Sequence, residues 1–477
     1  MGLAPSPLSS AISAMTRSKP PRTRESIFLP GLRLLTFALA SVFVAADAPP
    51  LAAQPPAKRQ RVTLPGPSDA PRKTRSVRVQ APADFRREHF LLHTDLAPRE
   101  ANELLDRLET MLTLIAKYWN HPPVGIIEMF VVEDLGRWPE GSLDPAGLAK
   151  IKQRAGITVT ETMTQGKRLL AAKSIVYAVA EHGTPQHEAV HAYCGQAFGH
   201  TGPLWYAEGM AEMGQYWREG DTSVQCPPYV VEFIRRSPAK PLADILAEDG
   251  GNPRRGAPTA TTGDSWQNYA WRWALCHLLA NNTNYSDRFR PLGLGLLSGQ
   301  KVSFADTYGA MRDEIEFEYQ FFLHHLQQGY RVDLCSWDWK RKFREPAGGN
   351  GIPSRISANR GWQPSGATVV EGKKYGYSAT GSWQCDKDGA ELTADGDTDG
   401  AGRLEGVVFK DFALGESFPL GASGTFTSPG DGRLFLRMHS RWNSLADNKG
   451  SVNVKIKNAA SAPPATPDSD STAKPTR

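Results

Sequence analysis

The chain has 477 residues, of which 40% are hydrophobic, and this length and composition allow two or three domains with buried cores. The formal net charge is +5, but residues 1–80 hold 12 Lys and Arg against 3 acids, or +9, which leaves 5 − 9 = −4 for the rest. The basic excess therefore belongs to the amino-terminal segment. Because no basic, aromatic-interleaved groove appears beyond it, we expect no nucleic-acid partner.

The amino-terminal segment has the pattern of a signal peptide. Basic residues precede an apolar run at residues 34–46, which ends in small residues near Ala46 and Ala48. The run is too short to span a bilayer comfortably, so we expect export to the periplasm, the cell surface or the medium, without a stable membrane span after processing. A retained anchor is the alternative. We predict a signal peptide over residues 1–48 and a disordered basic linker over residues 49–80.

The segments after the linker predict the beginning of a mixed sheet. Residues 90–94 and 125–133 are typical of strands, and residues 98–118 between them carry apolar residues at helical spacing. Residues 174–180 are rich in β-branched side chains and end before Gly183 and Pro185, which predicts another strand. If that strand lies at the edge of the sheet, it is the natural place for an extended peptide to pair its backbone.

Directly after that strand, the stretch His187-Glu188-Ala189-Val190-His191 places two histidines four residues apart. On a helix they share one face, so both rings can bind one ion. Glu188 adjoins the first histidine and can reach a water beside the ion without binding the ion itself. The alternative is a pair of helix histidines hydrogen-bonded to neighbours, with Glu188 on a solvated face.

A third metal ligand is predicted in the apolar and aromatic run at residues 204–213. Glu208 lies in this run, where an unpaired buried charge is costly and a metal ion would supply a partner. Three protein ligands that leave one position open are typical of a catalytic zinc site, whereas four ligands usually close a structural one. We expect Glu212, one turn further on, to orient a ligand histidine, while His182 and His200 lie outside the helical face.

These residues resemble the gluzincin (peptidase MA-like) metallopeptidases. The resemblance rests on the His-Glu-x-x-His stretch and on Trp205-Tyr206-Ala207-Glu208-Gly209-Met210-Ala211, which is similar to the aminopeptidase branch of that group. It implies a zinc ion held by His187, His191 and Glu208. It also implies an α+β zincin-like domain over residues 81–338, with a mixed sheet, active-site helices and a mostly helical second half.

The same resemblance implies a catalytic role for Tyr269, which would donate a hydrogen bond to the tetrahedral intermediate. The alternative is a tyrosine of the hydrophobic core. The sequence lacks the Gly-Ala-Met-Glu-Asn-type segment with which aminopeptidases grip a substrate amino terminus. Removal of single terminal residues is therefore not the expected activity.

The rest of this domain is predicted to be helical. Apolar spacing predicts helices over residues 228–236, 242–248, 271–280 and 304–328, with a flexible loop at residues 249–262. The chain has five cysteines, an odd number, so export permits a disulfide but leaves at least one thiol over.

Composition changes after Trp339 and predicts a second domain. We expect a linker over residues 339–360, an all-β sandwich over residues 361–458 and a disordered tail over residues 459–477. Short segments with alternating polarity, separated by Gly and Asp, support the sandwich; they lie at residues 367–370, 374–379, 406–409, 433–438 and 452–456.

Two stretches of the sandwich, Ala379-Thr380-Gly381-Ser382-Trp383 and Asp447-Asn448-Lys449-Gly450-Ser451, resemble the galactose-binding lectins of the PA-I type. The resemblance implies a cell-surface glycan as a partner and a calcium ion (Ca2+) near Asp447 and Asn448. His439-Ser440 stands where the family has an Asn-Asp pair, so a charged ligand is lost and we do not expect a tight calcium site. A purely structural accessory sandwich is the alternative.

Together these observations predict an exported zinc metallopeptidase that acts on a peptide or protein substrate. A zinc-activated water would attack the peptide carbonyl, with Glu188 as general base. The rival hypothesis is a catalytically inactive, zincin-derived binding protein that carries a carbohydrate-binding sandwich at the cell surface. A zinc hydrolase of a non-peptide amide is a third hypothesis.

Overall fold

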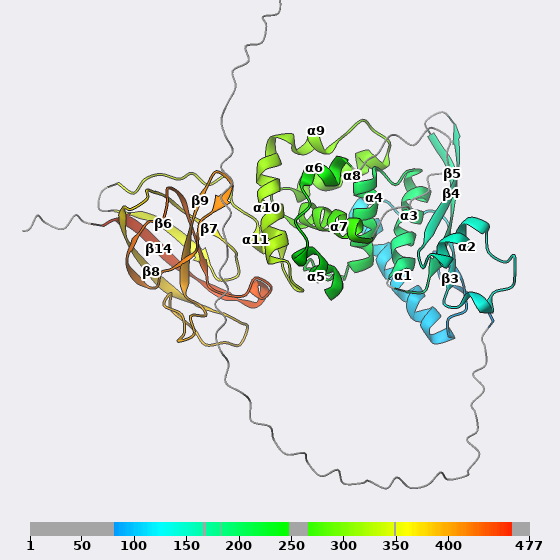
Figure 1. Ribbon diagram of the computed structural model, residues 1–477, viewed down its shortest axis with the longest axis horizontal. Coiled ribbons are helices and arrows are strands. Elements are labelled where there is room, and N and C mark those ends of the chain that lie inside the picture. The colour runs from blue at the N-terminus through cyan, green and yellow to red at the C-terminus, as the bar shows by residue number, and fades with distance from the viewer. Residues whose placement is uncertain (1–80, 166–167, 182, 248–265, 348–349, 460–477) are drawn as a thin grey trace, which may run out of the picture. The chain divides into compact units, whose positions relative to one another are not determined.

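Figure 1 shows the computed structural model, which describes residues 81–165, 168–181, 183–247, 266–347 and 350–459. The predicted signal peptide, the basic linker, the loop at 249–262 and the tail beyond Ala459 lie outside these ranges. The described residues form a mixed α/β part followed by a part made of β-sheets. This arrangement agrees with an α+β domain followed by a β-sandwich.

The α/β part contains a five-stranded sheet with the order β1-β2-β3-β5-β4. Its strands are β1 (Ala83–Arg86), β2 (Phe90–Thr94), β3 (Ile127–Val132), β4 (Ile157–Gln165) and β5 (Arg168–Val179). The strands β2, β3 and β5 run parallel, while β1 and β4 are antiparallel to their neighbours.

The strand expected at residues 174–180 is the second half of β5, but it does not lie at the edge of the sheet, because β5 pairs with β3 on one side and with β4 on the other. The edge strand next to β5 is β4. It was missed because its second half, Glu161 to Gln165, is exposed and polar apart from Met163, and this leaves no alternation of buried and exposed residues to detect.

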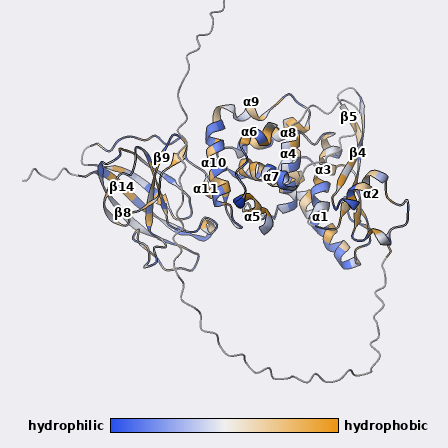
Figure 2. Cartoon of the chain, in the orientation of Figure 1, coloured by the Kyte–Doolittle hydropathy of each residue, from blue (hydrophilic) through white to orange (hydrophobic). Residues whose placement is uncertain are grey.

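The helix α1 (Pro98–Trp119) packs against β2 and against the later helix α3. Its buried residues recur at helical spacing, and Figure 2 shows hydrophobic and hydrophilic residues on different sides of the helix. Each large aliphatic side chain buried in this way contributes about 1.5–3 kcal/mol. The members of this buried stripe include Leu104, Leu105, Leu108, Met111, Leu112 and Ile115.

Among the described residues, this part also contains the helices α2 (Pro145–Lys152), α3 (Thr184–Phe198), α4 (Leu204–Tyr216), α5 (Pro228–Arg236), α6 (Leu242–Ala247), α7 (Trp266–Asn281), α8 (Ser286–Leu297), α9 (Phe304–Tyr308), α10 (Arg312–His325) and α11 (Val332–Cys335). The single helix predicted over residues 304–328 is divided into α9 and α10 by a 3-10 turn. The helix α8 was not predicted, because Pro291 and two glycines interrupt its apolar pattern.

Glu318 of α10 is a buried carboxylate that joins three segments of the helical part. Its two oxygens accept hydrogen bonds from the segment between α7 and α8, which includes the N-cap residue of α8, and from two residues that follow α11. Burial raises the pKa of Glu318, although these hydrogen bonds oppose the change. The donors are Asn282 Nδ2, Asn284 Nδ2, Tyr285 Oη, Trp337 N and Trp339 Nε1.

The carboxyl-terminal part consists of two sheets, with the orders β10-β9-β13-β7, where β11 also pairs with β9, and β12-β8-β14-β6. Residues from both sheets form one hydrophobic core. The strands are β6 (Ile352–Ser357), β7 (Gln363–Val369), β8 (Lys374–Gln384), β9 (Leu404–Lys410), β10 (Ala413–Leu414), β11 (Phe418–Pro419), β12 (Ser423–Thr427), β13 (Gly432–Met438) and β14 (Lys449–Asn458).

The five predicted strands of this part correspond to β7, β8, β9, β13 and β14, but the predicted linker over residues 339–360 is wrong at its end. The strand β6 lies inside it and pairs with β14 at the edge of a sheet. Pro353 is compatible with an edge strand, and Ile352 and Ile356 are buried. Because the residues around β6 are rich in Gly and Pro, their composition predicted a linker and not a strand.

The five cysteines are all free thiols, and no pair forms the disulfide that export would permit. Cys194, Cys226, Cys276 and Cys335 are buried, and Cys385 is partly exposed. Among the described residues, no helix combines the length and the apolar character needed to cross a bilayer.

Candidate metal centre

The two histidines of the motif lie on α3, which follows β5 after a short turn. Gly183 adopts a positive φ of 75° before the first turn, and Pro185 lies within that turn, where its missing N–H costs nothing. His187 and His191 are both buried, and their Nε2 atoms are 3.2 Å apart. The predicted helix therefore brings the Nε2 atoms of both rings close together.

The third residue of the cluster comes from α4, which packs beside α3 in Figure 1. Glu208 is completely buried, and its Oε2 lies 3.1 Å from His187 Nε2 and 3.5 Å from His191 Nε2. The ligand atoms of these three residues all lie within 4.8 Å of one another. The buried group of His187, His191 and Glu208 could therefore bind a metal ion.

Close packing of α4 against α7 positions Glu208. At Gly209 a Cβ would lie 2.7 Å from the carbonyl oxygen of Arg272, a distance that Cβ atoms do not adopt. The glycine therefore allows α7 to approach the backbone of α4 directly beside the ligand. This is the physical reason for the Glu-Gly pair in the predicted ligand stretch.

Glu212 orients His187 from the other side of the ring. The Nδ1–H of His187 donates to Glu212 Oε1 at 2.9 Å, so in the neutral imidazole the lone pair is on Nε2, which faces the cluster. Burial and the nearby charge of Glu212 raise the pKa of Tyr216, which lies one turn further along α4. Sequence analysis assigned the orienting role to Glu212 but did not single out Tyr216.

The electrostatics of the cluster favour a positive charge at its centre. Burial lowers the pKa of His187, but hydrogen bonds to Glu208 and Glu212 and their charges outweigh burial, so this pKa lies well above its ordinary value. Burial raises the pKa of Glu208, but the two imidazoles outweigh it and lower the pKa to about 2. A bound metal cation would supply positive charge at the same point of the cluster.

One buried atom fits a cation particularly well. Glu208 Oε1 has no hydrogen-bond partner among the described residues, although it is removed from water. An unpaired carboxylate oxygen in such a position is costly, and coordination is one way in which the cost is offset. The donor set of two imidazoles and one carboxylate suits zinc among several divalent metals.

Glu188 lies beside the cluster and is held by the edge strand β4. Thr158 Oγ1 lies 2.8 Å from Glu188 Oε2 and 2.8 Å from the carbonyl oxygen of Glu188. At Gly156 a Cβ would lie 2.6 Å from Glu188 Cγ, so this position accepts no larger residue without movement. Burial raises the pKa of Glu188, although the two histidines and Thr158 oppose the change.

Tyr269 of α7 lies next to the cluster. Its ring centroid is 5.4 Å from that of His187, and the two rings are tilted by 31°. The side chain is half-buried. The structure therefore places the ring of Tyr269 next to the cluster of His187, His191 and Glu208.

The remaining candidates do not belong to the cluster. His200 lies in the turn between α3 and α4, beside Gly299, and His182 is outside the described residues.

The two candidate calcium residues lie in the sandwich. Asn448 Nδ2 donates to Ala358 O at 3.1 Å and to Ser440 Oγ at 3.2 Å, while Asp447 is exposed. Asn448 thus links neighbouring segments of the sandwich.

Thr158 is the contact that sequence analysis missed. It precedes Glu188 by 30 residues and lies on a strand that was not predicted. Only the pairing of β4 with β5 brings Thr158 to α3, so no local signal marks it.

No family model and no curated protein matches the chain. Among solved structures, the chain is similar to one described as "EclA N-terminal domain; PllA-like lectin". The match has 18% sequence identity and a TM-score of 0.19, and it covers 23% of this chain and 98% of that chain.

Proposed function

We propose that the protein is an exported zinc-dependent hydrolase of the gluzincin type that cleaves peptide bonds. The observation that carries the proposal is the buried convergence of His187, His191 and Glu208 beside the carboxylate of Glu188. Three protein ligands leave a position for water or substrate, which is typical of catalytic zinc and not of structural zinc.

In this proposal each residue has a distinct role. His187, His191 and Glu208 hold the ion, and Glu212 fixes the ring of His187. Zinc, when bound, supplies Lewis acidity toward a carbonyl and lowers the pKa of water. Glu188 accepts a proton from the attacking water and returns it to the amide nitrogen as the C–N bond breaks, so the carboxylate is regenerated.

Two further features support a peptide substrate. The strand β4 is the edge of its sheet, and its residue Thr158 contacts Glu188, so an extended chain paired with β4 would pass the base. Tyr269 lies beside His187, where its hydroxyl would stabilise the oxyanion of the tetrahedral intermediate.

The test begins with the zinc content of the purified chain. We expect about one zinc per chain, lost in His187→Ala and kept in His200→Ala, which removes a histidine outside the cluster. A peptide library should then be cleaved by the zinc-loaded protein only. Protein purified without chelators that neither contains nor takes up zinc would overturn the proposal. Zinc without cleavage would favour the inactive binding protein.

A further inference from the structure

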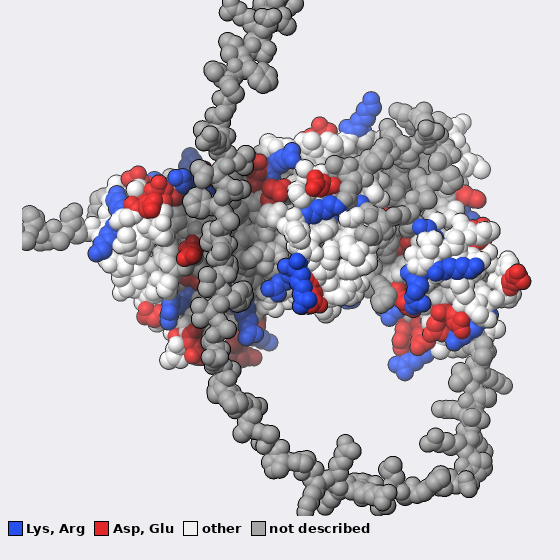
Figure 3. Space-filling view, viewed as in Figure 1, with Lys and Arg blue, Asp and Glu red and all other residues white. Residues whose placement is uncertain are grey.

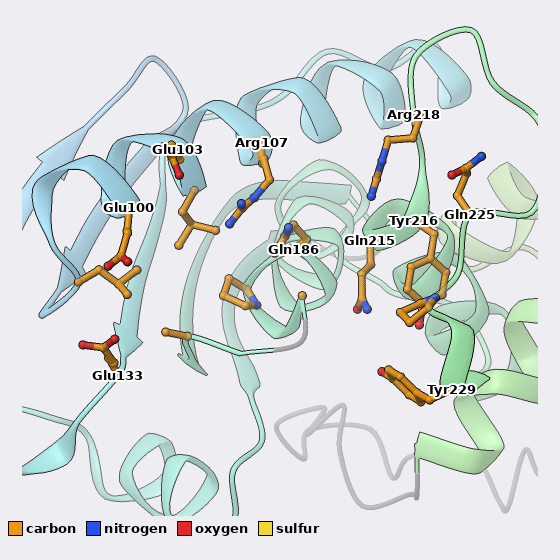
Figure 4. Close-up of a pocket in the computed structure, with 16 residues that line it drawn as sticks. Glu100, Glu103, Arg107, Glu133, Gln186, Gln215, Tyr216, Arg218, Gln225 and Tyr229 are labelled. Carbon is orange, nitrogen blue, oxygen red and sulfur yellow. The ribbon is translucent and has the colours of Figure 1, made fainter. Parts of the chain in front are cut away.

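The pocket drawn in Figure 4 does not include the metal centre. Its volume is about 650 Å³, and it lies between the first half of α1, the start of α3, the end of α4 and the start of α5. Neither the three candidate ligands nor Glu188 belongs to its lining. Figure 3 shows acidic and basic side chains intermingled over the start of α1, so this wall carries no single charge. A substrate that passes Glu188 therefore follows another surface, and β4 is the strand in contact with this residue.

The strand β4 runs away from Glu188 along α3. Thr158 contacts the carboxylate of Glu188 at 2.8 Å. At Gly195, about two turns further along α3, a Cβ would lie 2.6 Å from Thr160 Oγ1. Each step along β4 from Thr158 to Thr160 therefore leads away from the candidate base, toward the carboxyl end of α3.

Beyond Thr160, β4 and β5 form a two-stranded arm. The strand β3 pairs with β5 only from Ile175 onward, so the earlier residues of β5 pair with β4 alone. We define the β4–β5 arm as residues 161–165 and 168–173; Figure 1 shows the two strands side by side. All arm residues of β4 are exposed, with Met163 at 64%. Two strands alone are marginally stable in water, so a third strand would stabilise the arm.

The outer edge of β4 is regular and unblocked. In the described part of the chain no strand pairs with it. Its sequence contains neither proline nor lysine, with which natural proteins block exposed edges. The register shift between Met163 and Thr164 places its extra residue, Leu170, on β5, so β4 keeps a regular repeat. From Thr158 to Gln165 this free edge is about 23 Å long.

We propose that the β4–β5 arm binds the part of the substrate that precedes the cleaved bond. The inference rests on the proposed function and names its substrate class, an extended polypeptide with about seven residues before that bond. Antiparallel pairs are slightly more stable per residue than parallel ones, and a chain antiparallel to β4 would run from Gln165 toward Thr158. The residues paired with the arm therefore come before the residue that faces Glu188.

The test uses the full chain loaded with zinc and one peptide that it cleaves. The peptide is shortened to three residues on each side of the cleaved bond and is then lengthened by Thr-Ala pairs on one side at a time. We expect each pair on the amino side to raise kcat/KM about fivefold until the arm is filled, because each adds about two backbone hydrogen bonds. The same pairs on the carboxyl side should have no effect.

N-methylation separates strand pairing from a general effect of length. One N-methyl group is placed on successive amides of the amino-side extension. Only every second residue of a strand directs its N–H to the same neighbour, so kcat/KM should fall about fivefold at alternate positions and stay unchanged between them. Equal losses at every position would contradict pairing with β4.

Two changes at one exposed position assign the effect to the arm. Thr162→Pro removes a backbone N–H and disturbs the arm, so the long and the short peptide should approach equal kcat/KM. Thr162→Ala keeps the N–H and changes only the side chain, and the long peptide should remain the better substrate. Zinc content checks that the metal centre is intact in both variants.

The outcomes separate this inference from the proposed function. Cleavage without dependence on amino-side length, dependence on carboxyl-side length instead, or an undiminished preference for the long peptide in Thr162→Pro would each overturn the role of the arm alone. No cleavage of any peptide by the zinc-loaded protein would overturn the proposed function, and the role of the arm with it.

Discussion

His187 shows how much one side chain depends on its neighbours. Its Nδ1 is fixed by Glu212, and its Nε2 faces both His191 and Glu208. Because both nitrogens are committed, the ring has one orientation and one useful tautomer. The neighbours of His187 therefore fix how its ring faces the point where a metal ion could bind.

We expect Glu188→Gln to leave zinc bound and to lower turnover of a cleaved peptide by a factor of about 10³ or more. The amide keeps the shape of the side chain but cannot accept the proton of the attacking water. Zinc content and the turnover of one library-derived substrate measure the two effects. Comparable turnover in the variant and the parent would remove Glu188 from the mechanism.

The variant Glu212→Gln is expected to weaken zinc binding about 10- to 100-fold while the protein stays folded. The amide can still contact His187, but it lacks the charge that supports the imidazole. Competition with a fluorescent chelator measures the affinity. Glu219→Gln, an exposed change shortly after α4, is the matched control. An unchanged affinity would show that Glu212 does not act through His187.

At the scale of elements, the packing of α4 against α7 controls the position of Glu208. We expect Gly209→Ala to lower the free energy of unfolding by about 3 kcal/mol, because the new Cβ would overlap the backbone of α7. Urea unfolding measures the change. Gly309→Ala is the control, since its surroundings are open and its φ is −53°. Similar stabilities of the two variants would contradict this account.

The elements also show how far the sequence predicts the fold. The helix at residues 98–118 and the strands at 90–94 and 125–133 are confirmed as α1, β2 and β3, because each has a regular apolar pattern. The missed elements lack one: α2 is short, α8 contains Pro291, and β4 and β6 lie at sheet edges. Edge and short elements depend on tertiary contacts more than on local preference.

The metal cluster was predictable for a related reason. His187 and His191 are joined by helical spacing, Glu208 was predicted from its place in an apolar helical run, and Glu212 lies one turn further on that helix. The contacts of Thr158 and Gly156 with Glu188 depend on strand order, which no local pattern specifies. Sequence reasoning therefore found the residues on helices and missed those on the adjoining strand.

For the whole molecule, we expect acid to reduce stability through the buried histidine His277. Burial lowers its pKa to about 4, although Asp333 and Asp221 oppose the change. The unfolded chain takes up the proton near pH 6.5 and the folded chain only near pH 4, so stability falls as the pH falls through this interval. The loss is about 3 kcal/mol in total.

Urea unfolding at pH 7 and pH 5 tests this expectation in the parent and in His277→Gln. The variant has no proton to bind in this range, so its stability should change less between the two pH values. Because other groups titrate equally in both proteins, the difference isolates His277. Parallel pH profiles would contradict the assignment.

The hydrogen bonds of Glu318 determine where the chain can be truncated without damage to the helical part. Two of its five donors, Trp337 N and Trp339 Nε1, come from residues at or just before the point where composition changes. A fragment that stops before Trp337 would bury an ion with part of its hydrogen bonding removed, which is a severe defect. Fragments for expression should therefore include Trp339, since the helical part needs hydrogen-bond donors up to the point where composition changes.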